Sequence, residues 1–280
     1  MLPFSEKGFY MITLKYKNYT AVVLPEVGMN TFSLDLGRGE ILRKAPSVDV
    51  LKKDTNIYGI PMILPPGRIP GGRFTFEGRE YQMAINDMKG NTMIHGFVSR
   101  SAFTVDEVTE NSLRAHYENL GQILPFRFMM NVDFRLDEEG YHQHVEITNT
   151  GDGNMPLAFG FHSCFAEPEF EKLPLSGKMS RGAEHELDEH GLMLNAGCKL
   201  SDEIDDSYKL SGNEVIIGDY RYVLSDSLGY MTVWNYDAKS NFVAFEPQQG
   251  VANCFNTGCG LKVLAPGETS TYETQLAVLR

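Results

Sequence analysis

The sequence predicts an all-β protein built as a large sandwich of antiparallel sheets. Apolar and polar residues alternate with a period of two along much of the chain, which is typical of half-buried strands. No segment sustains an apolar stripe at helical spacing over three turns. The 27 glycines and 13 prolines are scattered as turn residues rather than gathered into a linker. We therefore expect a single domain over residues 1–280.

The most regular strand pattern is Phe126–Leu136, where an apolar residue occupies every second position. A turn is expected at Asp137–Gly140, and the alternation resumes over Tyr141–Ile147. A shorter hairpin is predicted over Arg73–Gln82, with a Glu-Gly turn at its centre. Further strands are expected at Thr31–Leu36, Ala102–Val105, Leu113–Tyr117, Tyr220–Leu224, Met231–Trp234 and Tyr272–Val278.

Two segments depart from the strand pattern. Ser47–Lys53 is compatible with one or two turns of helix. An acidic stretch that also carries histidines extends from Glu184 to Asp206. Its spacing fits no calcium loop, so we interpret it as a solvated excursion between strands.

The composition excludes several classes of protein. Hydrophobic residues make up 42% and charged residues 22%, a globular balance that excludes a disordered chain or a coiled coil. Lys and Arg number 25 against 37 Asp and Glu, and the net charge of −12 disfavours nucleic acid and membrane surfaces as partners. No run of about 18 apolar residues could form a transmembrane helix. The segment Met1–Tyr10 lacks the apolar stretch of a signal peptide.

The cysteines point to a reducing compartment. They are too few and too irregularly spaced for a disulfide scaffold or a zinc site. We interpret them as reduced thiols and expect a cytoplasmic protein. The four residues are Cys164, Cys198, Cys254 and Cys259.

Glu246 is the first candidate for a functional residue. It lies in the apolar segment Phe242–Pro247, both faces of which are expected to be buried. An ionised carboxylate on such a face is costly unless something binds it. Pro247 has no N–H and is expected to end the strand, which would leave Glu246 at a strand terminus, where functional groups often lie. The alternative is a carboxylate that simply reaches solvent there.

His162 is the second candidate. It follows Ala158 and Gly160 on one face of an expected strand whose other face is apolar. Two residues with almost no side chain beside an imidazole predict a face that stays open for a ligand. The alternative is a core histidine with satisfied hydrogen bonds.

A third region combines His95 with the proline-rich segment Leu64–Pro70. The prolines predict a rigid loop that presents Arg68 as a fixed donor, with an ordinary turn and a surface arginine as the alternative. His142 and His144 are two positions apart on one strand face. No third or fourth ligand is evident there, so we expect a solvent-facing strand and no metal site.

Taken in order, these motifs resemble the aldose 1-epimerase family (galactose mutarotase-like proteins), in its compact bacterial branch. The resemblance runs from about Gly59 to the segment Leu264–Glu268, which looks like the last turn and strand of that family. Five pieces in the right order make the resemblance specific. They are Pro65-Pro66-Gly67-Arg68-Ile69, the hairpin Phe74–Tyr81, Ile94-His95-Gly96, Gly160-Phe161-His162 and Glu246-Pro247.

The resemblance implies a galactose mutarotase-like β-supersandwich with a sugar cleft. In that family the residue matching Glu246 is the general base and the residue matching His162 is the general acid. The residues matching His95 and Arg68 hold the sugar. An aspartate also contributes, and its match is Asp205 or, as an alternative, Asp206. Many family members place a glutamine near the position that Thr232 occupies here, which leaves the preferred sugar open.

The chemistry of such an enzyme agrees with these residue types. Interconversion of anomers removes a proton from the C1 hydroxyl and gives one to the ring oxygen, after which the C1–C2 bond rotates and the ring closes on the other face. We expect one base and one acid at opposite ends of the ring, with no metal and no organic cofactor. The expected substrate is a free hexose such as galactose or glucose, turned over by a monomer or homodimer.

Two alternatives stay open. The first is a hexose-6-phosphate 1-epimerase, whose members tend to carry an arginine four residues after the histidine. Here Ser99 takes that position and Arg100 follows one residue later, on what would be the other face of a strand. A phosphate also favours a cluster of Arg or Lys. The second alternative is a sugar-binding or regulatory protein without turnover, whose cleft residues would look the same.

Overall fold

The computed structural model describes residues 5–6, 9–166, 176–180, 186–187, 193–194, 205–235 and 242–279. Within these residues strands predominate, as the sequence predicted, and the helical segments are α1 (Val48–Lys53), α2 (Cys254–Thr257) and the 3-10 turn η1 (Val98–Arg100). The short helix expected at Ser47–Lys53 is confirmed. Most of the acidic stretch from Glu184 to Asp206 lies outside the described residues, so its interpretation stays a prediction.

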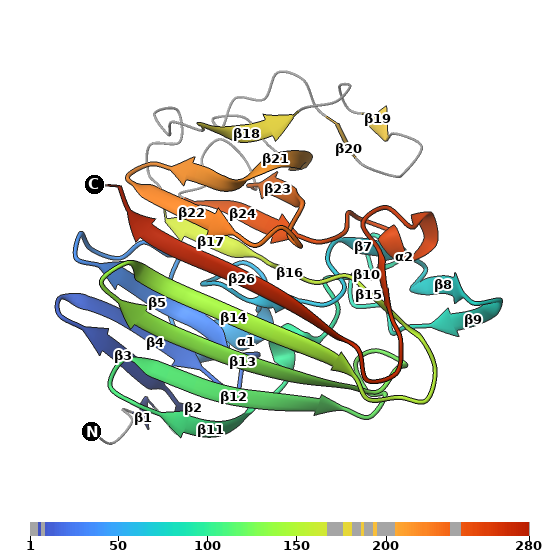
Figure 1. The fold of residues 1–280 in the computed structure, drawn as a ribbon, viewed down its shortest axis with the longest axis horizontal. Coiled ribbons are helices and arrows are strands. Elements are labelled where there is room, and N and C mark those ends of the chain that lie inside the picture. Colours follow the sequence, from blue (N-terminus) through green and yellow to red (C-terminus); the bar gives the residue numbers. More distant parts are fainter. Residues whose placement is uncertain are drawn as a thin grey trace.

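One large antiparallel sheet dominates the fold (Figure 1). Two further strands extend it. β17 (Ser163–Ala166) pairs with β24 (Phe242–Gln248), and β18 (Ser176–Ser180) pairs with β21 (Asp205–Ile217). In spatial order its path is β11 (Thr104–Val108), β12 (Ser112–Asn119), β13 (Phe128–Asp137), β14 (Gly140–Asn149), β26 (Thr269–Val278), β22 (Tyr220–Leu224), β21 (Asp205–Ile217), β23 (Tyr230–Trp234), β24 (Phe242–Gln248), β16 (Gly160–Phe161) and β6 (Met62–Ile63).

Smaller antiparallel units surround this sheet. A three-stranded sheet near the N-terminus consists of β3 (Ile12–Tyr16), β4 (Tyr19–Leu24) and β5 (Asn30–Leu36). The strand pairs are β1 (Ser5–Glu6) with β2 (Phe9–Tyr10), β7 (Arg68–Pro70) with β10 (Thr92–Ile94), β8 (Arg73–Phe76) with β9 (Arg79–Gln82), β15 (Met155–Leu157) with β25 (Lys262–Leu264), and β19 (Glu186–Leu187) with β20 (Met193–Leu194).

The burial of the strands follows the alternation seen in the sequence. Along β13, every second residue is buried and the residues between them are more exposed, without a break. The hairpin β8–β9 and the strand β22 have the predicted bounds. The sequence analysis missed β3 and β4, although Ile12 and Leu14 alternate with polar residues there. The long strand β21 was also not predicted. Local patterning thus located most of the described strands of five or more residues, but few of the shorter ones.

The core lies between the large sheet and the sheet β3–β5. Leu14 and Leu34 from the small sheet belong to the same buried cluster as Phe134 from the large one. A hydrogen bond also crosses this core, since the hydroxyl of Tyr141 lies 2.6 Å from Thr31 Oγ1. The bond satisfies a buried phenol and fixes the two layers relative to each other.

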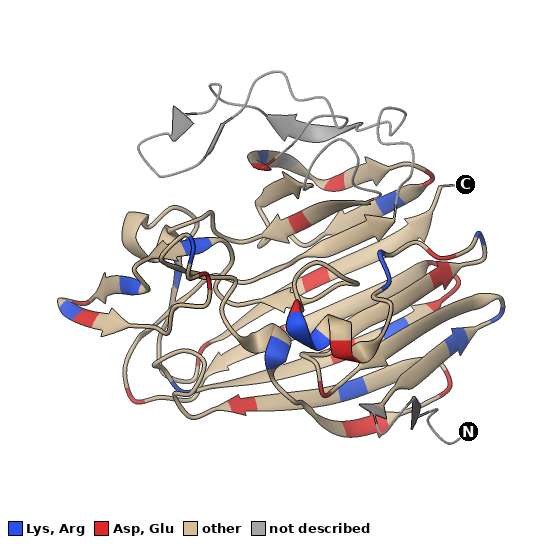
Figure 2. Ribbon diagram, turned by 180° about the vertical axis from the view of Figure 1, so that it is seen from behind, with Lys and Arg blue, Asp and Glu red and all other residues tan. Residues whose placement is uncertain are grey.

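Charged residues are spread over the fold. Figure 2 shows Lys and Arg interspersed with Asp and Glu over the fold as a whole. Helix α1 has Asp49 in its first turn and Lys52 and Lys53 in its last, the arrangement that the helix dipole favours. Among the residues that the structure describes, no helix has the length and apolar character needed to span a membrane.

A tight backbone contact positions the loop that follows β10. Gly96 bridges to Leu64 and has a φ of +63°, a conformation that favours glycine. A Cβ at Gly96 would lie 1.7 Å from the carbonyl oxygen of Leu64, so no side chain fits without moving the backbone. The neighbouring His95 is therefore held where two backbone segments touch.

We predict that Gly96→Ala lowers the free energy of unfolding by at least about 2 kcal/mol, because overpacking adds to left-handed strain. Gly71→Ala is the matched control. Gly71 has a φ of +62°, and a Cβ there would have no other atom within 4 Å, so this variant introduces the strain alone. Urea unfolding of both variants measures the difference. Equal losses would show that the contact with Leu64 contributes nothing beyond backbone conformation.

Candidate active site

Glu246 lies on an interior strand of the large sheet, β24. All seven residues of β24 are buried, and Glu246 itself is only 2% exposed. On one side β24 pairs with β23, and on the other side it pairs with β16 and β17. The predicted burial of both faces of this strand is confirmed. The ionisable side chain of Glu246 therefore lies among apolar neighbours.

The expectation that Pro247 ends the strand is wrong. β24 continues to Gln248, and Pro247 keeps its pairing with β23. On the other side, the pairing with β16 and β17 is interrupted between Phe245 and Gln248, which accommodates a residue without an N–H. Glu246 therefore lies inside the sheet rather than at a strand terminus, opposite the gap that holds His162.

His162 occupies the break between β16 and β17. Its backbone N–H donates to the carbonyl of Pro61 at 2.9 Å, which anchors the residue to the strand beside it. Its Nε2 lies 3.0 Å from Oε1 of Glu246, and each of the two side chains is 3% exposed. The structure thus brings the two candidate proton-transfer groups into direct contact.

The prediction that Gly160 keeps a face open for a ligand is wrong. A Cβ at Gly160 would lie 2.8 Å from the carbonyl oxygen of Pro247 and 3.0 Å from Cγ of Gln248. The position is occupied by the neighbouring strand. Gly160 is small because β24 packs directly against it, and this close packing is what brings the imidazole of His162 up to Glu246.

His95 reaches the same place from the loop after β10. Its φ of +57° is uncommon for a residue with a side chain, and the Gly67 carbonyl holds it by accepting its N–H at 2.9 Å. Its ring meets that of His162 edge-on, with centroids 5.0 Å apart. Nδ1 of His95 is buried and has no hydrogen-bond partner among the described residues. A bound polar ligand would satisfy that nitrogen.

Arg68 and Asp205 lie at the exposed rim. Their Nη1 and Oδ2 atoms are 3.7 Å apart, and their side chains are 49% and 46% exposed. Through β23, Asp205 is in register with Ala244 of β24, which shares a strand face with Glu246. The alternative aspartate, Asp206, has a side chain outside the described part of the chain. The structure thus brings together all five of the residues singled out from the sequence.

Three residues of the site were missed by the sequence analysis. Gln248 donates from Nε2 to Oε2 of Glu246 at 2.8 Å, and Sγ of Cys164 lies 3.4 Å from Nδ1 of His162. The ring of Trp234 meets the imidazole of His162 edge-on at a centroid distance of 5.8 Å. Gln248 and Cys164 each follow their partner by two positions, so the period-two spacing of a strand could have found them.

Burial dominates the electrostatics of the pair. It raises the pKa of Glu246 well above the ordinary 4.5, and the negative charge of Asp205 raises that pKa further, against the hydrogen bond from Gln248 and the charge of Arg68. Burial also lowers the pKa of His162 from 6.5 to about 3. A neighbouring carboxylate would be expected to hold the pKa of His162 up, but desolvation of the imidazolium outweighs that attraction. Together the two groups hold one proton.

The neighbouring groups stay neutral for the same reason. Burial lowers the pKa of His95 well below 6.5, and the positive charges of His162 and Arg68 act in the same direction. Burial raises the pKa of the Cys164 thiol well above 9.0, and the charge of Glu246 adds to that effect. The interior of the site therefore carries no net charge when the Glu246–His162 pair holds one proton, and its separately charged groups lie at the rim.

Two groups of described residues have the geometry to hold a metal ion. In each group the ligand atoms lie within 4.8 Å of one another. An ion in the buried group would compete with the shared proton, because a metal binds the deprotonated forms of these side chains. The buried group is His95, His162 and Glu246, and the more exposed one is Asp137, Glu139 and His142.

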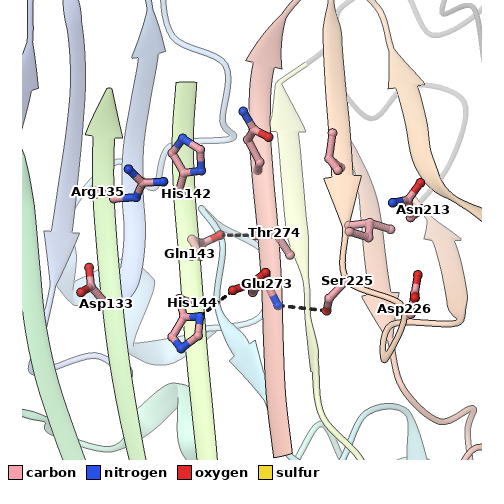
Figure 3. A pocket seen from close by; sticks show the side chains of 13 residues that line it. Asp133, Arg135, His142, Gln143, His144, Asn213, Ser225, Asp226, Glu273 and Thr274 are labelled. Carbon is pink, nitrogen blue, oxygen red and sulfur yellow. Dashed lines mark hydrogen bonds and ion pairs between the residues drawn. The ribbon is translucent and has the colours of Figure 1, made fainter. Parts of the chain in front are cut away.

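A polar groove of about 650 Å³ lies elsewhere on the large sheet, over β13, β14, β26 and β22 (Figure 3). His142 and His144 line it, paired at 2.9 Å with Asp137 and Glu273 respectively. They are partly exposed, which confirms the solvent-facing strand that was expected. β24 is the third strand beyond β22, roughly 14 Å away at the usual strand spacing. The groove is therefore separate from the site around Glu246.

Comparison with known proteins identifies the fold and the family. The chain is 24% identical over 225 residues to the protein YihR of Escherichia coli K12, which covers 72% of this chain and 73% of that protein. A solved galactose mutarotase-like protein from Clostridium acetobutylicum has a TM-score of 0.85 at 22% identity and covers 96% of this chain and 95% of that one. A galactose 1-epimerase from Lactobacillus acidophilus NCFM has a TM-score of 0.72 at 15% identity, with 99% and 98% covered.

These solved structures share the β-supersandwich that the family resemblance implied. At such identities they establish the fold, and the family is established separately by the sequence. The aldose 1-epimerase family matches this chain over residues 10–277, which is nearly its whole length. This protein therefore belongs to the aldose 1-epimerase family.

Proposed function

We propose that this protein is an aldose 1-epimerase that interconverts the α and β anomers of a free hexose. The observation that carries the proposal is the buried contact of 3.0 Å between Nε2 of His162 and Oε1 of Glu246. Opening the ring requires proton transfer at the C1 hydroxyl and at the ring oxygen. A contacting acid and base that share one proton suit this reaction.

The distance between the two groups also corrects the expectation that the acid and the base lie at opposite ends of the sugar ring. The C1 hydroxyl oxygen and the ring oxygen are both bonded to C1, so the groups that serve them must be neighbours. His162 and Glu246 satisfy this requirement because they contact each other directly.

The proposed reaction keeps one proton on the pair. Glu246, as the carboxylate, removes the proton of the C1 hydroxyl while His162, as the imidazolium, donates a proton to the ring oxygen. The bond between C1 and the ring oxygen breaks, and a carbonyl forms at C1. Glu246 now holds the proton and His162 is neutral. Rotation about C1–C2 presents the other face of the carbonyl, and the reverse transfers close the ring and restore the pair.

The rim and the neighbouring histidine would bind the sugar. Arg68 offers donors and Asp205 offers acceptors to hydroxyl groups of the sugar. A further sugar hydroxyl could hydrogen-bond to Nδ1 of His95, which is buried and has no partner among the described residues. Thr232 lies directly across from Glu246 and shares a hydrogen bond of 2.9 Å with Ser207. A short threonine here, in place of the glutamine of many relatives, bears on which hexose is preferred.

A free hexose is favoured over a hexose 6-phosphate. Ser99 is 1% exposed and lies 2.9 Å from the hydroxyl of Thr55, so it offers no cation at the position where phosphate-specific relatives tend to carry arginine. At the rim, the carboxylate of Asp205 beside Arg68 would repel a phosphate.

We predict that the protein accelerates the mutarotation of freshly dissolved α-glucose or α-galactose, followed by polarimetry or NMR. The hexose 6-phosphates should react more slowly, and a chelator should leave the rate unchanged. No acceleration with any common aldose would overturn the proposal. Calorimetric sugar affinity without turnover would instead indicate a binding protein, and inhibition by the chelator would indicate a metal at His162.

We predict that Glu246→Gln and His162→Asn each reduce kcat by roughly 10²- to 10⁴-fold, since each removes one proton-transfer group. His144→Asn is the matched control, because that histidine lies partly exposed on β14. Thermal unfolding should show that all three variants keep the fold. Near-full turnover in either of the first two variants would show that the assigned role is wrong.

We predict a bell-shaped pH–rate profile whose two limbs belong to the pair. On the acid side the rate falls when the pair gains a second proton, at a pH below the ordinary 6.5 of histidine because burial lowers the pKa of His162. On the alkaline side it falls when the last proton leaves, at a pH above the ordinary 4.5 of a carboxyl because burial raises the pKa of Glu246. A rate that rises steadily with pH would mean that no protonated acid is needed.

A further inference from the structure

We infer that Gln248 and Cys164 are positioning residues that hold the Glu246–His162 pair in one tautomer. In this tautomer the exchanging proton lies between Oε1 and Nε2, and Nδ1 of His162 always carries its own proton. The inference deepens the proposed function and rests on it for the catalytic consequence. The tautomer itself can be measured without turnover.

Four side chains form one continuous buried series. Gln248 Nε2 lies 2.8 Å from Glu246 Oε2, Glu246 Oε1 lies 3.0 Å from His162 Nε2, and His162 Nδ1 lies 3.4 Å from Cys164 Sγ. None of the four residues is more than 3% exposed. With water largely excluded, these polar atoms must satisfy one another.

Gln248, at one end of the series, sets the donor-to-acceptor direction of its hydrogen bonds. An amide N–H can only donate, so Oε2 of Glu246 accepts and any carboxyl proton must lie on Oε1. That proton points to Nε2 of His162, which therefore has none of its own while the imidazole is neutral. The single proton of the neutral ring is then on Nδ1, which faces Sγ of Cys164.

The cysteine end is compatible with the same direction. Sγ of Cys164 lies 3.5 Å from the carbonyl oxygens of Asn56 and His162. A carbonyl can only accept, so the thiol proton has an acceptor there and the sulfur is left to accept from Nδ1. Burial keeps the pKa of Cys164 well above 9.0, so the thiol stays protonated and does not take the imidazole proton.

This arrangement confines proton exchange to the two atoms that would meet the sugar. Nδ1 is protonated when Glu246 holds the shared proton and also when His162 holds it. The opposite tautomer would place the proton of the neutral imidazole on Nε2. His162 could then no longer accept the proton of the open-chain hydroxyl whose oxygen becomes the ring oxygen when the sugar closes.

Nitrogen NMR of protein labelled with ¹⁵N-histidine tests the tautomer. The chain has seven histidines, and the signal lost in His162→Asn identifies the one in question. We expect Nδ1 of His162 to be protonated in the wild type and in Cys164→Ser, and the Nε2–H form to be populated in Cys164→Ala. Cys254→Ala, which alters a buried thiol outside the site, should match the wild type. A bare Nδ1 in the wild type would overturn the inference.

Kinetics test the glutamine end. Gln248→Met keeps the volume and removes the donor, and we expect kcat to fall about tenfold or more with KM nearly unchanged. Gln249→Met is the control, because this neighbouring glutamine donates to the carbonyls of Leu157 and Gly260 and accepts from the hydroxyl of Tyr272 instead. Equal effects on kcat in both variants would overturn the positioning role of Gln248. A protonated Nδ1 in a protein without epimerase activity would instead overturn only the proposed function.

Discussion

Burial of an ionisable pair inside a sheet is the constraint on which the rest of the site depends. Glu246 and His162 contact each other at 3.0 Å with almost no exposure to water. Neither group can carry an isolated charge there without a large desolvation penalty, so the pair is restricted to states with one proton. Those two states, with the proton on either partner, are the states that precede and follow the proposed ring opening. The burial that restricts the pair to one proton therefore also selects the two protonation states that the proposed reaction uses.

The close packing of strands produces that contact. β24 is covered by neighbours on both sides, and the interruption between β16 and β17 admits the imidazole of His162 into the gap. The absence of a side chain at Gly160 allows the strands to approach. Gln248 and Cys164 then hold the outer atoms of the pair, so that only Oε1 and Nε2 are left to exchange a proton. Backbone geometry and polar contacts act together on the same two atoms.

The site changes character from its interior to its rim. The interior is rigid because it is built mainly from sheet residues, and it carries no net charge because burial disfavours isolated charges. Arg68 and Asp205 at the rim are charged and about half exposed. His95 lies between the two, on a loop held by backbone bonds to Gly67 and Leu64. Such a gradient suits a neutral, polyhydroxylated ligand, whose hydroxyls need many partners but no strong counter-charge.

The strands with strong alternation, such as β13, could be predicted from the amino-acid sequence alone. The same holds for the two residues whose types are able to transfer protons, Glu246 and His162. Period-two patterning reports local burial, and a carboxylate in an apolar strand stands out without any structure. Three features could be seen only in the folded chain: Pro247 lies within a strand, Gly160 serves strand packing, and Glu246 and His162 touch. Each of these depends on which strands become neighbours, and pairing between distant segments leaves no local signature because it is set by the packing of the whole sheet.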